Sequence, residues 1–198
     1  LKEAMTALEQ RKYAEAERLF IKFLEVYPKT QSADTARLNL HKSRVEKYIM
    51  TTTPDVAKGK HELDDLLRIG KDLPGFPEER ENIRRYADRL TFAGARVAEI
   101  TQQQEPLDIS RLSMEILTRF SPETGIPRDR ADILERHQRI AEAAIAKRVA
   151  FSDAVRRIRG FLEAGKTAEA LAARRELLDR YQVLADDKDV AALLVEIL

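Results

Sequence analysis

Apolar residues recur every three to four positions along most of the chain, and this spacing is the strongest constraint on its fold. No segment of four to eight residues alternates apolar with polar residues in the manner of a half-buried strand. Ala, Leu, Glu, Lys and Arg make up just over half of the 198 residues, which is the composition of a helix-dominated chain. Seven Gly and seven Pro are too few for collagen-like, mucin-like or turn-rich all-β proteins. We therefore expect an all-α protein.

Helix-breaking residues divide the apolar stripes into separate helices. The expected helices cover residues 1–11, 13–27, 33–50, 54–71, 78–103, 107–120, 129–148, 152–164 and 167–183, with another from about 187. Thr53 is expected to cap the helix that begins with Pro54, and the sequence leaves open whether 129–164 is one helix or two. Helices of this length joined by short turns bury their apolar faces on sequence neighbours, so we expect stacked antiparallel pairs.

Two distant stretches of the chain share a local pattern. Residues 13–16 are YAEA and residues 167–170 are TAEA. In both stretches a small residue three positions after the turn, Ala16 or Ala170, would allow two helices to approach closely. Larger side chains follow one and two turns later and would fill the groove between the helices. The pattern indicates an internal repeat.

These two stretches resemble the tetratricopeptide repeat family. The positions that carry the resemblance are Ala4, Leu8, Arg11, Lys12, Tyr13, Ala16, Phe20 and Pro28 near the start, and Phe161, Gly165, Ala170 and Leu177 near the end. The first stretch looks like the bacterial cell-envelope branch of that family, which includes outer-membrane assembly lipoproteins and Tol-Pal-associated proteins. In that branch a Tyr-Pro pair is followed by an Ala and two alternating Leu residues, here Ala36, Leu38 and Leu40.

The resemblance implies a right-handed solenoid of stacked antiparallel helical hairpins, and a location in the bacterial cell envelope or periplasm. Within one helical-repeat domain over residues 1–198, segments 1–50 and 151–198 would have the repeat structure. Residues 51–150 lack most of the signature positions. We therefore expect divergent hairpins, and an irregular solenoid, in the middle of the chain.

The two ends of the chain indicate a fragment of a longer protein. Residue 1 is a Leu that already lies in a helical pattern. Near the other end, one uncapped helical face is formed by Val190, Leu193, Leu194 and Ile197. Such a face needs a cover, so we expect either that the polypeptide continues or that a second copy docks there. No apolar stretch approaches the roughly 18 residues of a membrane span, so we expect no membrane insertion in this segment.

Residues 160–167 match the phosphate-binding P-loop pattern G-x-x-x-x-G-K-T. A P-loop follows a buried β-strand, whereas residues 154–159 have the pattern of a charged amphipathic helix. The same residues fit a helical hairpin in which Gly165 ends one helix and Thr167 caps the next. We therefore interpret the match as coincidental and keep a nucleotide-binding protein as an alternative.

Other candidates for chemistry are weak. His41, His61 and His137 each lie alone on a helix, without the spaced ligands that a metal site needs, so we expect no metal and no cofactor. The net charge of +1 and the absence of Trp do not support nucleic-acid binding, and the absence of Cys excludes thiol chemistry. The densest basic stretch, residues 147–159, is scattered around its helix and indicates a solvated surface. We therefore do not expect an enzyme.

The concave side of a helical stack would then be the functional surface. The groove positions of the family correspond to six residues, three on each of two helices: Leu1, Met5, Leu8, Leu38, Lys42 and Val45. The three on each helix share a face, although the apolar ones could instead pack on a missing preceding repeat. The leading hypothesis is a non-catalytic scaffold that binds a protein or peptide. A second hypothesis is a structural subunit that self-assembles through its terminal helices, and the nucleotide-binding protein is the third.

Overall fold

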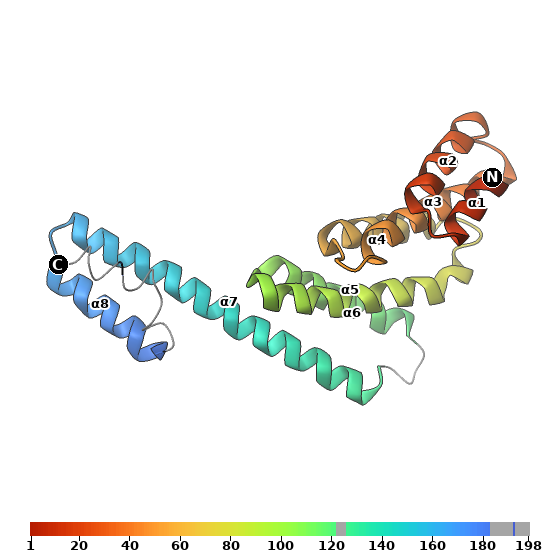
Figure 1. The fold of residues 1–198 in the computed structure, drawn as a ribbon. Coiled ribbons are helices and arrows are strands. Elements are labelled where there is room, and N and C mark those ends of the chain that lie inside the picture. The colour runs from red at the N-terminus through yellow and green to blue at the C-terminus, as the bar shows by residue number, and fades with distance from the viewer. Residues whose placement is uncertain (122–125, 183–191, 193–198) are drawn as a thin grey trace. The chain divides into compact units, whose positions relative to one another are not determined.

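The computed structural model describes residues 1–121, 126–182 and 192, and every regular element in these ranges is a helix (Figure 1). The elements are α1 (Lys2–Glu9), α2 (Tyr13–Val26), α3 (Gln31–Ile49), α4 (Val56–Gly70), the short 3-10 helix η1 (Pro77–Glu79), α5 (Arg80–Thr101), α6 (Gln104–Phe120), α7 (Arg128–Glu163) and α8 (Thr167–Arg180). The prediction of an all-α protein is confirmed for this part of the chain.

The chain divides into two compact units where the sequence suggested one domain. Unit 1 comprises Leu1–Ala141 and unit 2 comprises Glu142–Leu198, so the boundary lies inside α7. This helix is continuous over 36 residues. No Gly or Pro interrupts residues 128–159, which explains why one helix forms here rather than two. The solenoid stays a prediction.

Unit 1 consists of helices that pack on their sequence neighbours, with α3 at the centre. α3 packs on α2, α4 and α5, and α4 also packs on α6. A smaller apolar cluster joins α3 to α1 and α2, and includes Ala16, Phe20 and Leu40. A larger cluster joins α3 to α4, α5 and α6, and includes Leu63 and Leu90. Burial of these side chains, at roughly 25 cal/mol per Å² of apolar surface, is the main force that holds the unit together.

The turns between α1 and α2 and between α7 and α8 have the same backbone geometry. Arg11 (φ 59°) and Gly165 (φ 69°) both adopt the left-handed conformation. The N–H groups of the next residues, Lys12 and Lys166, each donate to the carbonyl five positions earlier, at 2.9 and 2.8 Å. Such six-to-one bonds end a helix in the Schellman manner. The prediction that Gly165 ends a helix is confirmed.

Within unit 2, the end of α7 and the whole of α8 form a helical hairpin. Ile158 on α7 is fully buried against Ala170 and Ala173 on α8. Ala170 and its counterpart in unit 1, Ala16, both have no exposed surface. The small side chains therefore lie where the repeat pattern predicted close approach of two helices.

The starts of α4 and α6 differ from the prediction in ways that have a physical reason. Asp55 rather than Thr53 caps α4, because its Oδ1 accepts a hydrogen bond from the Lys58 N–H at 3.1 Å. Pro54 therefore precedes the helix instead of opening it. α6 begins three residues earlier than expected and includes Pro106. Proline is tolerated there because an N–H in the first turn would have no partner within the helix.

α5 and α6 approach each other closely at Gly94. A Cβ atom added to Gly94 would lie 2.7 Å from the carbonyl oxygen of Pro106 and 2.9 Å from the backbone nitrogen of Ser110. The Ser110 hydroxyl donates to the carbonyl of Thr91 at 2.7 Å and so joins the two helices at the same point. Because backbone atoms cannot rotate aside as a flexible side chain can, only glycine fits here.

Gly94→Ala should lower the free energy of unfolding by about 1–3 kcal/mol, because the new methyl group forces α5 and α6 apart. Gly75→Ala is the matched control: its Cβ would meet only Leu38 Cδ2, at an ordinary 3.5 Å. That substitution should change stability by less than about 1 kcal/mol. Urea unfolding followed by circular dichroism measures both. Equal effects would contradict the close helix approach.

Candidate functional site

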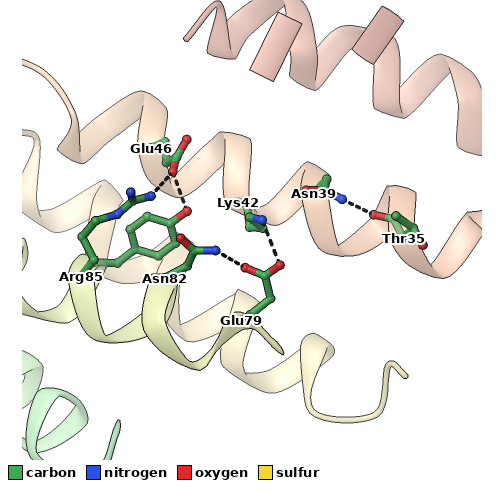
Figure 2. Close-up of polar contacts among 8 residues, drawn as sticks. Thr35, Asn39, Lys42, Glu46, Glu79, Asn82 and Arg85 are labelled. Atoms are coloured by element: carbon green, nitrogen blue, oxygen red, sulfur yellow. Dashed lines mark hydrogen bonds and ion pairs between the residues drawn. The ribbon is translucent and has the colours of Figure 1, made fainter. Parts of the chain in front are cut away.

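Polar side chains lie along one side of α3 (Figure 2). Asn39, Lys42 and Glu46 are three or four residues apart and so share a face of the helix. Asn39 and Glu46 are buried, so their polar groups need partners inside the protein. The Asn39 amide donates to the carbonyl of Thr35 within α3 at 2.9 Å. Lys42 and Glu46 instead form their contacts with η1 and α5.

Glu46 accepts two hydrogen bonds from the beginning of α5. Its Oε1 accepts from the Arg85 guanidinium at 2.8 Å and from the Tyr86 hydroxyl at 2.7 Å. Tyr86 is fully buried. Burial, and next the nearby Glu46 charge, raise the pKa of the Tyr86 hydroxyl far above its ordinary value, so the hydroxyl remains protonated and donates. The buried carboxylate is thereby paired with one charged and one neutral donor.

Glu79, the last residue of η1, forms a second junction with α3. Its Oε1 accepts from the Lys42 ammonium at 2.9 Å, and its Oε2 accepts from the Asn82 amide at 2.6 Å (Figure 2). The Lys42 and Glu79 side chains keep only 16% and 12% of their surface exposed. Water therefore screens this ion pair weakly, and removal of one partner would leave a shielded charge unpaired.

Arg89 continues these contacts one turn further along α5. Its Nε donates to the carbonyl of Ile49 at 3.2 Å, and a terminal nitrogen donates to the carbonyl of Thr51 at 3.0 Å. Carbonyl groups at a helix C-terminus lack partners within the helix and carry the negative end of its dipole. Arg89 therefore caps the end of α3 and attaches the loop between α3 and α4 to α5.

A groove of about 410 Å³ lies beside this junction, and we call it the α5 groove. The residues that line it are Thr52, Thr53 and Pro54 from the loop between α3 and α4, and Arg89, Phe92, Ala93, Arg96, Val97 and Ile100 from α5. The α5 members share a face about a third of a turn away from the core stripe of this helix. Ile100 is 70% exposed, so the groove presents an apolar side chain to solvent.

The α5 groove carries positive charge. Arg89 and Arg96 line it, and no carboxylate is among its described lining residues. Arg96 is exposed and forms no ion pair with a residue that the structure describes. The Arg130 guanidinium lies 4.6 Å from the centroid of the Phe92 ring, although Asp88 also pairs with it at 2.8 Å. The groove therefore combines an apolar wall with cationic groups.

The residues predicted from the family groove do not form one surface. Leu38 and Val45 are 4% and 0% exposed and belong to the larger core cluster. This corrects the prediction for both, because α4 and α5 cover that face of α3. Lys42 is held by Glu79. Three others are partly buried against the smaller cluster beside α1 and α2: Leu1, Met5 and Leu8.

The four positions of the predicted assembly face lie outside the described residues: Val190, Leu193, Leu194 and Ile197.

Sequence reasoning placed residues 78–103 on a helix but did not identify the α5 groove. The predicted stripe of that helix ran through Tyr86, Leu90 and Val97 and described only its core face. Phe92 and Ile100 lie off this stripe. Apolar residues on a second face were the available signal, since a surface helix usually has a single apolar stripe.

The P-loop pattern lies at the turn of a helical hairpin, and two of the histidines lie beside carboxylates. Residues 160–163 end α7, and Thr167 is the first residue of α8 rather than its cap, which is Lys166. A helix, not a strand, therefore precedes the pattern. The His137 Nδ1 lies 2.7 Å from Glu99 Oε2, and His61 lies 3.9 Å from Asp65. Residues 1–121 and 126–182 contain no group of three or more His, Cys, Asp or Glu placed to hold a metal.

Comparison of the chain with protein-family models, curated proteins and solved structures found no match. In the part of the chain that the structure describes, no helix has the length and apolar character needed to span a bilayer. Function is therefore inferred from the α5 groove and from the contacts that position it.

Glu46→Ala should lower the free energy of unfolding by about 1–3 kcal/mol, because it leaves the buried Tyr86 hydroxyl without an acceptor. Tyr86→Phe alone should cost about 0.5–1.5 kcal/mol. The double variant should cost less than the sum, since the two groups form one hydrogen bond. Urea unfolding of all four proteins measures this coupling. Additive effects would show that the two residues do not interact.

Because of His41, we expect the free energy of unfolding to decrease as the pH falls below neutral. It is 7% exposed, and its Nδ1 has no hydrogen-bond partner among the described residues. Burial, and next the Arg44 charge, lower the pKa of the imidazole below its ordinary 6.5. The unfolded chain therefore binds a proton at higher pH than the folded chain does. The stability that the neutral imidazole contributes is complete above about pH 6.5 and is lost as the pH falls below that value.

We expect the free energy of unfolding to fall more between pH 7 and pH 5 in the original protein than in His41→Gln, because the variant removes the buried imidazole. Urea unfolding at a series of pH values measures the two slopes. The comparison removes the contributions of His61 and His137, which are present in both proteins. Equal slopes would contradict the shifted pKa of His41.

Proposed function

We propose that this chain is a non-catalytic scaffold that binds a protein segment in the α5 groove. The observation that carries the proposal is the exposed apolar wall of that groove, with Ile100 70% exposed beside two arginines. Exposed apolar surface rimmed by polar groups is typical of protein interaction sites. Arginine and aromatic residues, here Arg89, Arg96 and Phe92, are also the side chains most enriched at such interfaces.

The arrangement of titratable groups supports binding rather than catalysis. The strongly shifted hydroxyl of Tyr86 serves the junction between α3 and α5. Glu17 has a lowered pKa: burial raises it, but the stronger combined effect of the Arg44 and Lys47 hydrogen bonds and charges lowers it. None of these groups lines the α5 groove. Groups tuned for acid–base chemistry are expected inside a cleft, whereas Tyr86 and Glu17 hold neighbouring helices together.

The family resemblance supports the scaffold in a second way. Helices of unit 1 pack on their sequence neighbours. The turns of both terminal hairpins contain one residue in the left-handed conformation, and in each the next N–H donates to the carbonyl five positions earlier. These features agree with our proposal of a tetratricopeptide-like, right-handed stack of hairpins that is irregular in the middle. In such a stack stability comes from neighbouring helices, and the remaining faces are available for partners.

A photo-crosslinking residue at position 100 tests the docking surface in cells that make this protein. A control places the same residue at Ala57, which is exposed on α4 and does not line the groove. We expect one defined protein to crosslink at position 100 and not at position 57. The purified partner is then titrated against the original protein and Ile100→Asp by calorimetry.

Ile100→Asp should weaken binding of that partner by about tenfold or more, because a charge replaces an apolar contact. The melting temperature should stay nearly unchanged, since Ile100 is already 70% exposed. Identical crosslinked products at positions 100 and 57, or unchanged affinity of Ile100→Asp, would contradict docking in the α5 groove.

A further inference from the structure

We propose that the segment bound by the α5 groove is an acidic amphipathic helix whose carboxylates lie about two turns apart. This inference rests on the proposed docking role of the groove. It follows from the spacing of the two arginines, from the apolar wall between and beyond them, and from the backbone of α5, whose N–H and C=O groups are paired within the helix.

The two arginines set the spacing of the carboxylates. Arg89 and Arg96 are seven residues apart on α5, which corresponds to about 10 Å along the helix axis. Arg89 uses its Nε and one terminal nitrogen for the end of α3, and its other terminal nitrogen has no partner among the described residues. Arg96 has no described partner at all. Both can therefore bind a carboxylate without breaking an existing contact.

The apolar wall sets the length and form of the segment. From Arg89 to Ile100, one face of α5 extends over about 16 Å and carries apolar side chains at intervals of three to four residues. A helix lying in a groove presents anchors with the same period. An extended peptide would instead need free N–H and C=O groups, and the walls formed by α5 use theirs within the helix. The matching period favours a helical partner.

The amount of positive charge favours a protein over a nucleic acid. Nucleic-acid binding takes a longer row of cations along the phosphate backbone. Here two arginines are separated by apolar side chains, among them Ala93 and Val97. A segment with two carboxylates and apolar residues between them matches this alternation, whereas a polyphosphate does not.

A segment of this chain with these properties provides the probe. Residues 186–198 are DDKDVAALLVEIL, which lie outside the described positions apart from Ala192. Asp189 and Glu196 are seven residues apart, with mainly apolar residues between them. The occupant that we propose is such a helix of a partner protein, for which this peptide stands in, and docking of a second copy of the chain is an outcome that the test distinguishes.

The experiment measures binding of a fluorescent, end-blocked peptide of residues 186–198 to the full chain by anisotropy. We expect saturable binding that weakens with salt. Arg96→Glu should lower the affinity by about tenfold or more, because the carboxylate then meets a like charge. The matched control is Arg84→Glu, which makes the same charge change on α5 at a residue outside the groove. It should change the affinity by less than about twofold.

Peptide variants test the chemistry of the segment itself. A peptide with Asp189→Asn and Glu196→Gln keeps the apolar face and should bind about tenfold more weakly. Against the Arg96→Glu protein, a peptide with either Asp189→Lys or Glu196→Lys should recover binding, and the one that does so gives the direction of the bound helix. Sedimentation of the full chain identifies the source: mass that rises with concentration and is lost in Arg96→Glu supports a second copy.

Two outcomes would overturn the inference. Equal binding of the acidic and amide peptides, with no effect of Arg96→Glu, would remove the acidic requirement. Docking in the groove would still stand if Ile100→Asp weakened both peptides. Absence of binding by every peptide would reject the acidic amphipathic helix, while a partner crosslinked at position 100 would still support the proposed function. The two failures are therefore distinguishable.

Discussion

Unit 1 depends on the enclosure of α3, whose middle is buried on nearly all sides. Between Leu38 and Glu46 most residues are buried, including polar ones such as Asn39 and Ser43. The Ser43 hydroxyl donates a hydrogen bond to the carbonyl of Leu40, and the Glu46 carboxylate accepts from α5. A buried carboxylate is stable only when its hydrogen-bond donors are well placed, so few arrangements of the donors are possible. Because those donors are consecutive residues of α5, Glu46 defines where that helix lies on α3.

Much of the helix pattern could be predicted from the sequence because local signals determine it. The left-handed Gly165 and the unbroken stretch before it mark the hairpin in unit 2. The cap of α4 was missed because Thr53 and Asp55 are both good caps two residues apart, and the Asp55 side chain reaches the backbone nitrogen of Lys58. The arrangement of the hairpins depends on contacts between distant residues, for which the sequence has no comparable local signal.

The candidate site was harder to predict, because burial on α3 is decided by helices that follow it in the chain. Leu38 and Val45 have the spacing of an exposed face, but packing of α4 and α5 covers them. Lys42 is long and charged, yet Glu79 holds it at a shielded junction. Conversely, Ile100 lies on a helix that already has a core stripe. That it belongs to a groove can be recognised only from the structure, which places the loop after α3 as the opposite wall.

The double role of Arg89 has a thermodynamic consequence. The same guanidinium holds the carbonyl groups at the end of α3 and lines the α5 groove. A molecule that binds the folded groove and not the unfolded chain stabilises the folded state by mass action. Here that stabilisation would be concentrated at the seam between α3 and α5. As more of the groove is occupied, local opening of the contact between α3 and α5 would become rarer. The exchange rate of backbone amide hydrogens near Ile49 would therefore fall on binding, although these amides do not touch the bound molecule.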